Sequence, residues 1–81
     1  MKPYTFFIKT NDPSKAILLA KQEVSTRDGV MQGGKFNAKG FSGEYKQVHG
    51  GVEITLTEKP MMIPIILIEP RVREWFNSMG A

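Results

Sequence analysis

The start of the chain alternates between apolar and polar positions. Over residues 4–10, Tyr4, Phe6 and Ile8 fall on one side, with mainly polar side chains on the other. A period of two is typical of a half-buried strand. Phe7 falls on the polar side, so we expect it to face away from the core.

A helix is predicted to follow this strand. Asp12 is a suitable N-cap because its carboxylate can accept hydrogen bonds from the first-turn amides, and Pro13 has no amide to leave unpaired. We expect the helix to end at Asp28 and Gly29, with the glycine adopting the left-handed conformation. The predicted apolar stripe, about 100° wide, consists of Pro13, Ala16, Ile17, Ala20 and Val24.

Glycines separate short apolar alternations in the middle of the chain, and six of the eight glycines lie in residues 33–51. This pattern predicts a meander of three strands. Within the first strand of the meander, Gly33 and Gly34 indicate either a bulge or a start of the strand delayed to Lys35. The predicted strands cover residues 30–37, 41–48 and 52–57, with turns at residues 38–40 and 49–51.

The last third of the chain is apolar and contains three prolines. Helical spacing favours one helix over about residues 64–78, bent at Pro70 because proline cannot donate to the carbonyl of Ile66. The alternative is that residues 61–68 form a fifth strand and that a short helix begins at Pro70. The predicted stripe consists of Ile65, Ile68, Val72, Trp75, Phe76 and Met79.

Together these elements predict a single α+β domain over residues 1–81, a two-layer sandwich with the order β-α-β-β-β-α. The first helix reverses the chain direction between the strand at residues 4–10 and the meander. We therefore expect a four-stranded sheet, with the first strand parallel to its neighbour at an outer position. Both helices are expected to cover one face of this sheet.

Composition excludes several kinds of chemistry. Without cysteine the chain has no disulfide, thiolate metal site or cysteine nucleophile. The longest apolar run, residues 61–68, is interrupted by Pro64 and is too short to span a bilayer. We see no signal peptide at the start and expect a cytoplasmic location. The net charge of +3 is compatible with an anionic partner but does not require one.

Catalytic and metal-ligand patterns are not recognisable in the sequence. The single histidine, His49, lies in a predicted turn, where exposure to solvent is the ordinary explanation. No catalytic residue, cofactor or metal ligand is predicted, and a small enzyme ranks third among the functions considered.

Residues 39–45 begin like the signature of an RNA-recognition motif, with lysine, glycine and an aromatic residue. The signature fails at Gly43 and Glu44, where an aromatic and an apolar residue are required. Weak binding of single-stranded nucleic acid is therefore the alternative function. Its cations would be Lys35, Lys39 and Lys46, beside aromatic side chains of the strands.

Some apolar residues point away from the predicted core. Several exposed apolar side chains together can form a surface that binds another protein or a second copy of the chain. Our first prediction is therefore a non-catalytic binding or protein-interaction module of unknown ligand. The candidate surface consists of Phe7, Leu18, Met62, Ile66 and Leu67.

Motifs in about the last 50 residues resemble those of a known protein family. Gly34 and Phe36 precede a Gly-x-Tyr strand at residues 43–46, a strand ending in Lys-Pro at residues 54–60, and a helix with Ile-Glu and Val-Arg pairs at residues 68–76. This arrangement resembles a family of small, uncharacterised bacterial α+β proteins. More loosely, it is similar to a family associated with polyhydroxyalkanoate granules. The resemblance implies the order β-α-β-β-β-α and no activity, and Pro70 departs from its pattern.

Overall fold

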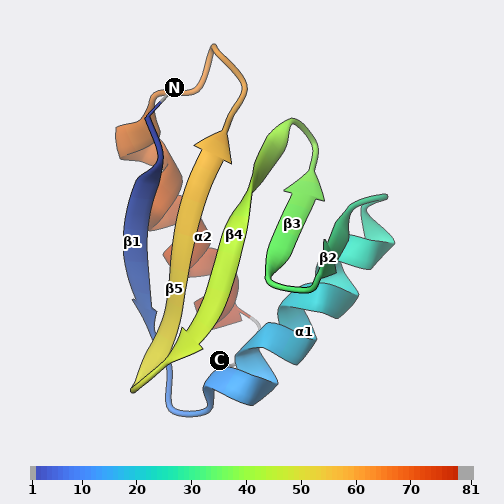
Figure 1. Ribbon diagram of the computed structural model, residues 1–81, viewed down its shortest axis with the longest axis vertical. Coiled ribbons are helices and arrows are strands. Elements are labelled where there is room, and N and C mark those ends of the chain that lie inside the picture. Colours follow the sequence, from blue (N-terminus) through green and yellow to red (C-terminus); the bar gives the residue numbers. More distant parts are fainter. Residues whose placement is uncertain (1, 79–81) are drawn as a thin grey trace.

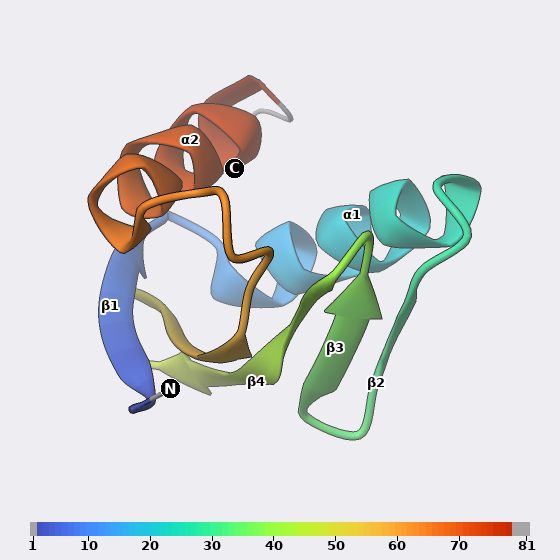
Figure 2. The same ribbon diagram turned by 90° about the horizontal axis from the view of Figure 1, so that it is seen from above.

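The computed structural model describes residues 2–78 and shows two helices packed on a five-stranded antiparallel sheet. The strands lie in the order β1-β5-β4-β3-β2 (Figure 1). Both helices lie on the concave face of the curved sheet (Figure 2). The elements are β1 (Tyr4–Lys9), α1 (Pro13–Thr26), β2 (Val30–Gln32), β3 (Lys35–Ala38), β4 (Phe41–Val48), β5 (Gly51–Glu58) and α2 (Ile65–Ser78).

The predicted four-stranded sheet with a parallel first strand is wrong, because the segment predicted as one strand folds into a hairpin. Gly33 and Gly34 both have positive φ, 61° and 81°, and they connect the paired residues Gln32 and Lys35. A two-residue turn with two positive φ angles suits the twist of a hairpin. The extra reversal changes the direction of every later strand, so β5 runs antiparallel to β1.

Helix α1 begins as predicted but ends differently. Oδ1 of Asp12 accepts the amide hydrogen of Lys15 at 3.1 Å. At the other end Asp28, with φ of 61°, takes the left-handed conformation that was predicted for Gly29. Gly29 is needed for space instead: a Cβ there would lie 2.6 Å from Cγ1 of Val24 and 2.7 Å from Cβ of Ala38.

Helix α2 runs continuously through Pro70, as the apolar stripe predicted, and the alternative strand over residues 61–68 is wrong. Pro70 is exposed, so the missing amide falls on the solvent side of the helix. Ile68 and Phe76 of the stripe are buried. Met79, the last residue of the predicted stripe, lies outside the described residues.

The core lies between the helices and the central strands. Trp75 of α2 and Tyr45 of β4 lie at the margin of the core and pack against its buried residues. On the opposite sheet face Lys46 pairs with Glu53 at 3.6 Å, which fits a turn at His49 and Gly50. The buried cluster consists of Phe6, Ile8, Ala16, Ala20, Val52, Ile54 and Phe76.

Candidate functional site

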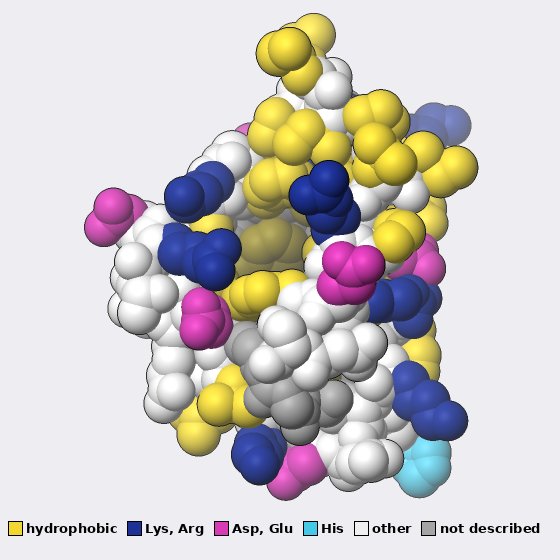
Figure 3. Space-filling view, turned by 180° about the vertical axis from the view of Figure 1, so that it is seen from behind, with side chains coloured by type: hydrophobic (Ala, Val, Ile, Leu, Met, Phe, Trp, Pro, Cys, Tyr) yellow, Lys and Arg dark blue, Asp and Glu magenta, His cyan; other side chains and the backbone are white. Residues whose placement is uncertain are grey.

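The clearest hollow in the described surface is an apolar groove between α1 and α2, with a volume of about 600 Å³. Its floor is the inner face of β3, β4 and β5, and residues 62–64 form one end. Figure 3 shows it from the helix side as a hollow lined by hydrophobic side chains, with Lys and Arg side chains on both sides. We call this hollow the interhelical groove. Its lining residues come from the five strands, from both helices and from the loops that connect these elements.

The groove exists because the two helices pack at opposite edges of the sheet. Helix α1 packs against β2, β4 and β5, whereas α2 packs against the edge strand β1. Ala16 and Ala20 are fully buried, and these small side chains let the first half of α1 approach the sheet closely. From that end the two helices run apart, α1 toward β2 and α2 behind β1 and β5 (Figure 1), so the inner faces of β3 and β4 stay uncovered between them.

The part of the groove floor that β3 and β4 form is aromatic and only partly buried. Phe36, Phe41 and Tyr45 all line it. The ring of Phe36 lies over Gly43, where an added Cβ would approach its Cζ atom to 2.8 Å. Glycine at this position therefore lets the ring lie flat on the sheet. These inward-facing residues contribute to the core and also present apolar surface to solvent.

Among the residues of 2–78 that line the groove, three are cations and none is acidic. Arg27 follows α1, Lys39 lies in the β3–β4 turn with φ of 51°, and Arg71 belongs to α2. Nη2 of Arg27 lies 3.6 Å from Oε2 of Glu23, in an exposed pair. Within residues 2–78, Lys39 and Arg71 form no ion pair. The groove therefore combines an apolar floor with three lining cations, and Asp and Glu side chains lie just outside the lining on both sides (Figure 3).

The structure divides the predicted interaction surface. Met62 and Leu67 line the groove and are 93% and 53% exposed, and Ile66 beside them is 77% exposed. Phe7, 40% exposed, is on the other sheet face, where its ring lies over Gly51. Leu18 is 56% exposed on α1 and does not line the groove. Of the five predicted residues, the structure brings together only Met62, Ile66 and Leu67.

The predicted nucleic-acid contacts do not converge either. Lys35 stands opposite Glu44, and Lys46 pairs with Glu53, on the outer face of the sheet. The aromatic floor is on the inner face, where Lys39 is the only one of the three predicted lysines. Base stacking beside phosphate contacts needs both groups on one face. This arrangement does not favour binding of single-stranded nucleic acid.

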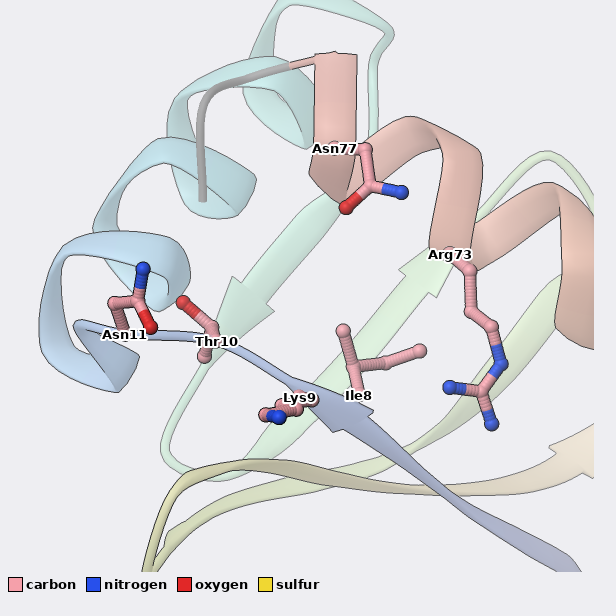
Figure 4. Close-up of a pocket in the computed structure, with 6 residues that line it drawn as sticks. All are labelled: Ile8, Lys9, Thr10, Asn11, Arg73 and Asn77. Atoms are coloured by element: carbon pink, nitrogen blue, oxygen red, sulfur yellow. The ribbon is translucent and has the colours of Figure 1, made fainter.

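A second hollow of about 350 Å³ lies between the end of β1 and α2. The side chains around it do not point toward a common centre: Arg73 extends away from Thr10 and Asn11 (Figure 4). Arg73 is also occupied, since its Nη2 lies 2.6 Å from Oε2 of Glu69. We therefore consider the interhelical groove the better candidate.

Two titrations are shifted where β1 meets α2. Hydrogen bonding from Arg73 lowers the pKa of Glu69, and the Tyr4 hydroxyl contributes in the same direction. The hydrogen bond to Glu69 raises the pKa of Tyr4, with help from burial. Neither group lines the groove. These shifts reflect the attachment of α2 to the sheet edge and do not indicate a reactive group.

Sequence reasoning missed Arg27 and Arg71 as candidate site residues. Arg71 lies off the apolar stripe of α2, and Arg27 follows the last residue of α1; in both places a charged residue ordinarily only contacts solvent. Phe36, Phe41 and Tyr45 at the groove floor are not among the residues predicted for the interaction surface; aromatic side chains of the strands enter only the alternative of nucleic-acid binding. The available signal was the presence of aromatic residues at positions 36, 41 and 45 of the predicted meander.

Searches for a metal site, for a membrane-spanning helix and for similar proteins do not identify a function. Within residues 2–78, no three His, Asp or Glu side chains lie close enough to hold a metal ion. The described helices include none that is both long and apolar enough to cross a membrane. The family resemblance of the sequence remains a prediction. Comparisons with protein-family models, with curated proteins and with solved structures find no match for this chain.

Proposed function

We propose that this protein is a non-catalytic binding module and that the interhelical groove is its ligand-binding surface. One observation carries the proposal: an open, aromatic-floored groove of about 600 Å³ continues into the exposed side chains of Met62 and Leu67. Ligand sites are typically concave, mostly apolar hollows of roughly 300–1,000 Å³ with a few polar groups at defined places.

The energetics of burial support this role. Fully burying a large apolar side chain contributes about 1.5–3 kcal/mol. The partly exposed Phe36, Phe41 and Tyr45 of the floor leave some of that contribution unrealised in the free protein. A ligand that covers these rings recovers it. This gain is what must offset the lost freedom of the two molecules on association.

The lining supports binding without catalysis. Acid–base and nucleophilic mechanisms need ionisable groups that converge on a reacting atom. The groove contains no histidine, aspartate or glutamate among its lining residues, and its three cations come from three separate segments. The hollow between β1 and α2 likewise has no acidic or histidine lining residue.

Fluorescence offers a direct test, because Trp75 is the only tryptophan and it lines the groove. We expect the amphipathic anionic dye anilinonaphthalene sulfonate to bind the folded protein and to accept energy from Trp75. Leu67→Gln should weaken dye binding several-fold. Leu18→Gln is the matched control, because Leu18 has nearly the same exposure on the other helix, 56% against 53%.

The two variants make the result decisive. Both replace an exposed helical leucine with a neutral polar residue, so their effects on stability should be small and similar. Equal dye affinity of Leu67→Gln and Leu18→Gln, or no dye binding to the folded protein, would contradict the proposed binding surface.

A further inference from the structure

We infer that the occupant of the interhelical groove is an amphipathic helix of a different protein, with acidic side chains beside its apolar face. The inference rests on the proposed function and specifies its ligand. Three features carry it: the extent of the apolar surface, the pairing of the main-chain groups of the floor strands with one another, and the three cations among the lining residues.

The apolar surface extends beyond what a small molecule in the groove would cover. Met61 is 95% exposed and Ile66 is 77% exposed, and neither lines the groove. They adjoin the lining residues Met62 and Leu67 in the chain. Hydrophobic side chains accordingly gather above the hollow at the end where the β5–α2 loop lies (Figure 3). Contiguous exposed apolar surface of this kind marks protein contacts, and methionine adapts well to such surfaces.

The groove favours a helix over an extended segment. Its floor is a sheet face, where the strands already pair with one another, and its walls are helices whose main-chain groups are bonded internally. An extended segment there would find few main-chain partners. A helix satisfies its own main chain and needs only an apolar stripe, which is the helix-in-groove form of recognition.

The cations among the lining residues favour a partner with acidic flanks. Arg27, Lys39 and Arg71 line the groove from three segments, and Lys39 and Arg71 form no ion pair within residues 2–78. A partner with glutamate or aspartate beside its apolar stripe would pair with them. Complementary charge of this kind steers association and discriminates against basic partners.

The same charges disfavour a second copy of this chain. In a two-fold dimer the same patch meets itself, so the cations of both copies would be brought to one interface. The net charge of +3 adds to that repulsion. A different protein with an acidic amphipathic helix avoids both effects.

A set of three synthetic peptides tests the inference. The first is a helix of about four turns with leucines at positions i, i+3, i+4 and i+7 and glutamates on both flanks. The second replaces every glutamate with lysine, and the third permutes the first so that the leucines no longer share a face. Trp75 fluorescence and the anisotropy of a labelled peptide report binding. We expect the glutamate peptide to bind at least about tenfold more tightly than the others.

Charge reversal in the protein locates the effect. Arg71→Glu should weaken the glutamate peptide and strengthen the lysine peptide. Lys21→Glu makes the same change in charge at an exposed position of α1 outside the groove and should leave both affinities nearly unchanged. Equal effects of the two variants would overturn the inference, as would equal binding of all three peptides.

Other occupants give distinct results. If laurate binds in an Arg71-dependent manner and no peptide does, the ligand is a small amphipathic anion. If sedimentation at two concentrations shows a dimer that shields Trp75, the occupant is a second copy. Either result overturns the inference. If dye binding depends on Leu67 but no peptide binds, the helix is wrong and the proposed function stands; loss of the Leu67 dependence removes both.

Discussion

The hydroxyl of Tyr4 at the start of β1 donates a hydrogen bond of 2.9 Å to Oε1 of Glu69 in α2. The other carboxylate oxygen of Glu69 accepts hydrogen bonds from Nε and Nη2 of Arg73. The last helix is thereby attached to the edge strand β1. Because α1 packs at the opposite edge, this attachment helps to keep the interhelical groove open.

The Tyr4–Glu69 pair predicts a specific pH dependence. The pKa of Glu69 is lowered on folding, chiefly by Arg73, so its contribution to stability is present above the ordinary glutamate pKa and is lost as pH falls. The pKa of Tyr4 is raised, chiefly by Glu69, so its contribution is present below pH 10.0 and is lost as pH rises. The difference in Tm between wild type and Tyr4→Phe should therefore be largest between about pH 5 and pH 10.

Thermal unfolding across this range checks the prediction. Tyr45→Phe is the control, because the Tyr45 hydroxyl makes no side-chain hydrogen bond within residues 2–78. A Tm difference for Tyr4→Phe that is constant from acid to alkaline pH would show that the hydrogen bond to Glu69 does not couple the two titrations.

Two glycines should respond very differently to alanine. At Gly43 the added methyl group would fall on the carbonyl oxygen of Thr55 and on the Phe36 ring, at a cost of about 3 kcal/mol. At Gly33, with φ of 61° and open space around it, only backbone strain of about 1 kcal/mol is expected. Urea unfolding of both variants measures the difference, and equal costs would contradict the close approach at Gly43.

Pro70 predicts a stabilising substitution. Pro70→Ala supplies an amide for the carbonyl of Ile66, at an exposed position where no packing is disturbed. We expect the free energy of unfolding to rise by up to about 3 kcal/mol, reduced by the greater freedom of alanine in the unfolded chain. A loss of stability in urea unfolding would show that the proline ring makes a contact that the helix needs.

The sequence predicted most elements from periodicity, and β4 and α2 are where their patterns placed them. The sheet topology was wrong because of the two residues Gly33 and Gly34. Each flanking strand has four residues or fewer, too short for an alternation to show an interruption. A glycine pair there permits a bulge, a delayed start or a hairpin. Whether the last strand runs parallel or antiparallel to β1 depends on which of the three forms.

The groove could not be predicted in the same way. Apolar stripes tell which face of each helix is buried, but not how far apart the two helices lie. That separation depends on tertiary contacts such as the Tyr4–Glu69 hydrogen bond, which joins residues 65 positions apart. The alternation over residues 41–48 predicts a strand, but it does not show that Phe41 and Tyr45 stay partly exposed at the groove floor.

Chemical-shift mapping by NMR tests the central claim most directly. Titrating labelled protein with the glutamate peptide should perturb the Trp75 indole and the side chains of Met62 and Leu67, with little change at Phe7 and Leu18. Perturbation centred on Phe7 or Leu18, while the groove signals stay unchanged, would show that this protein binds through another surface.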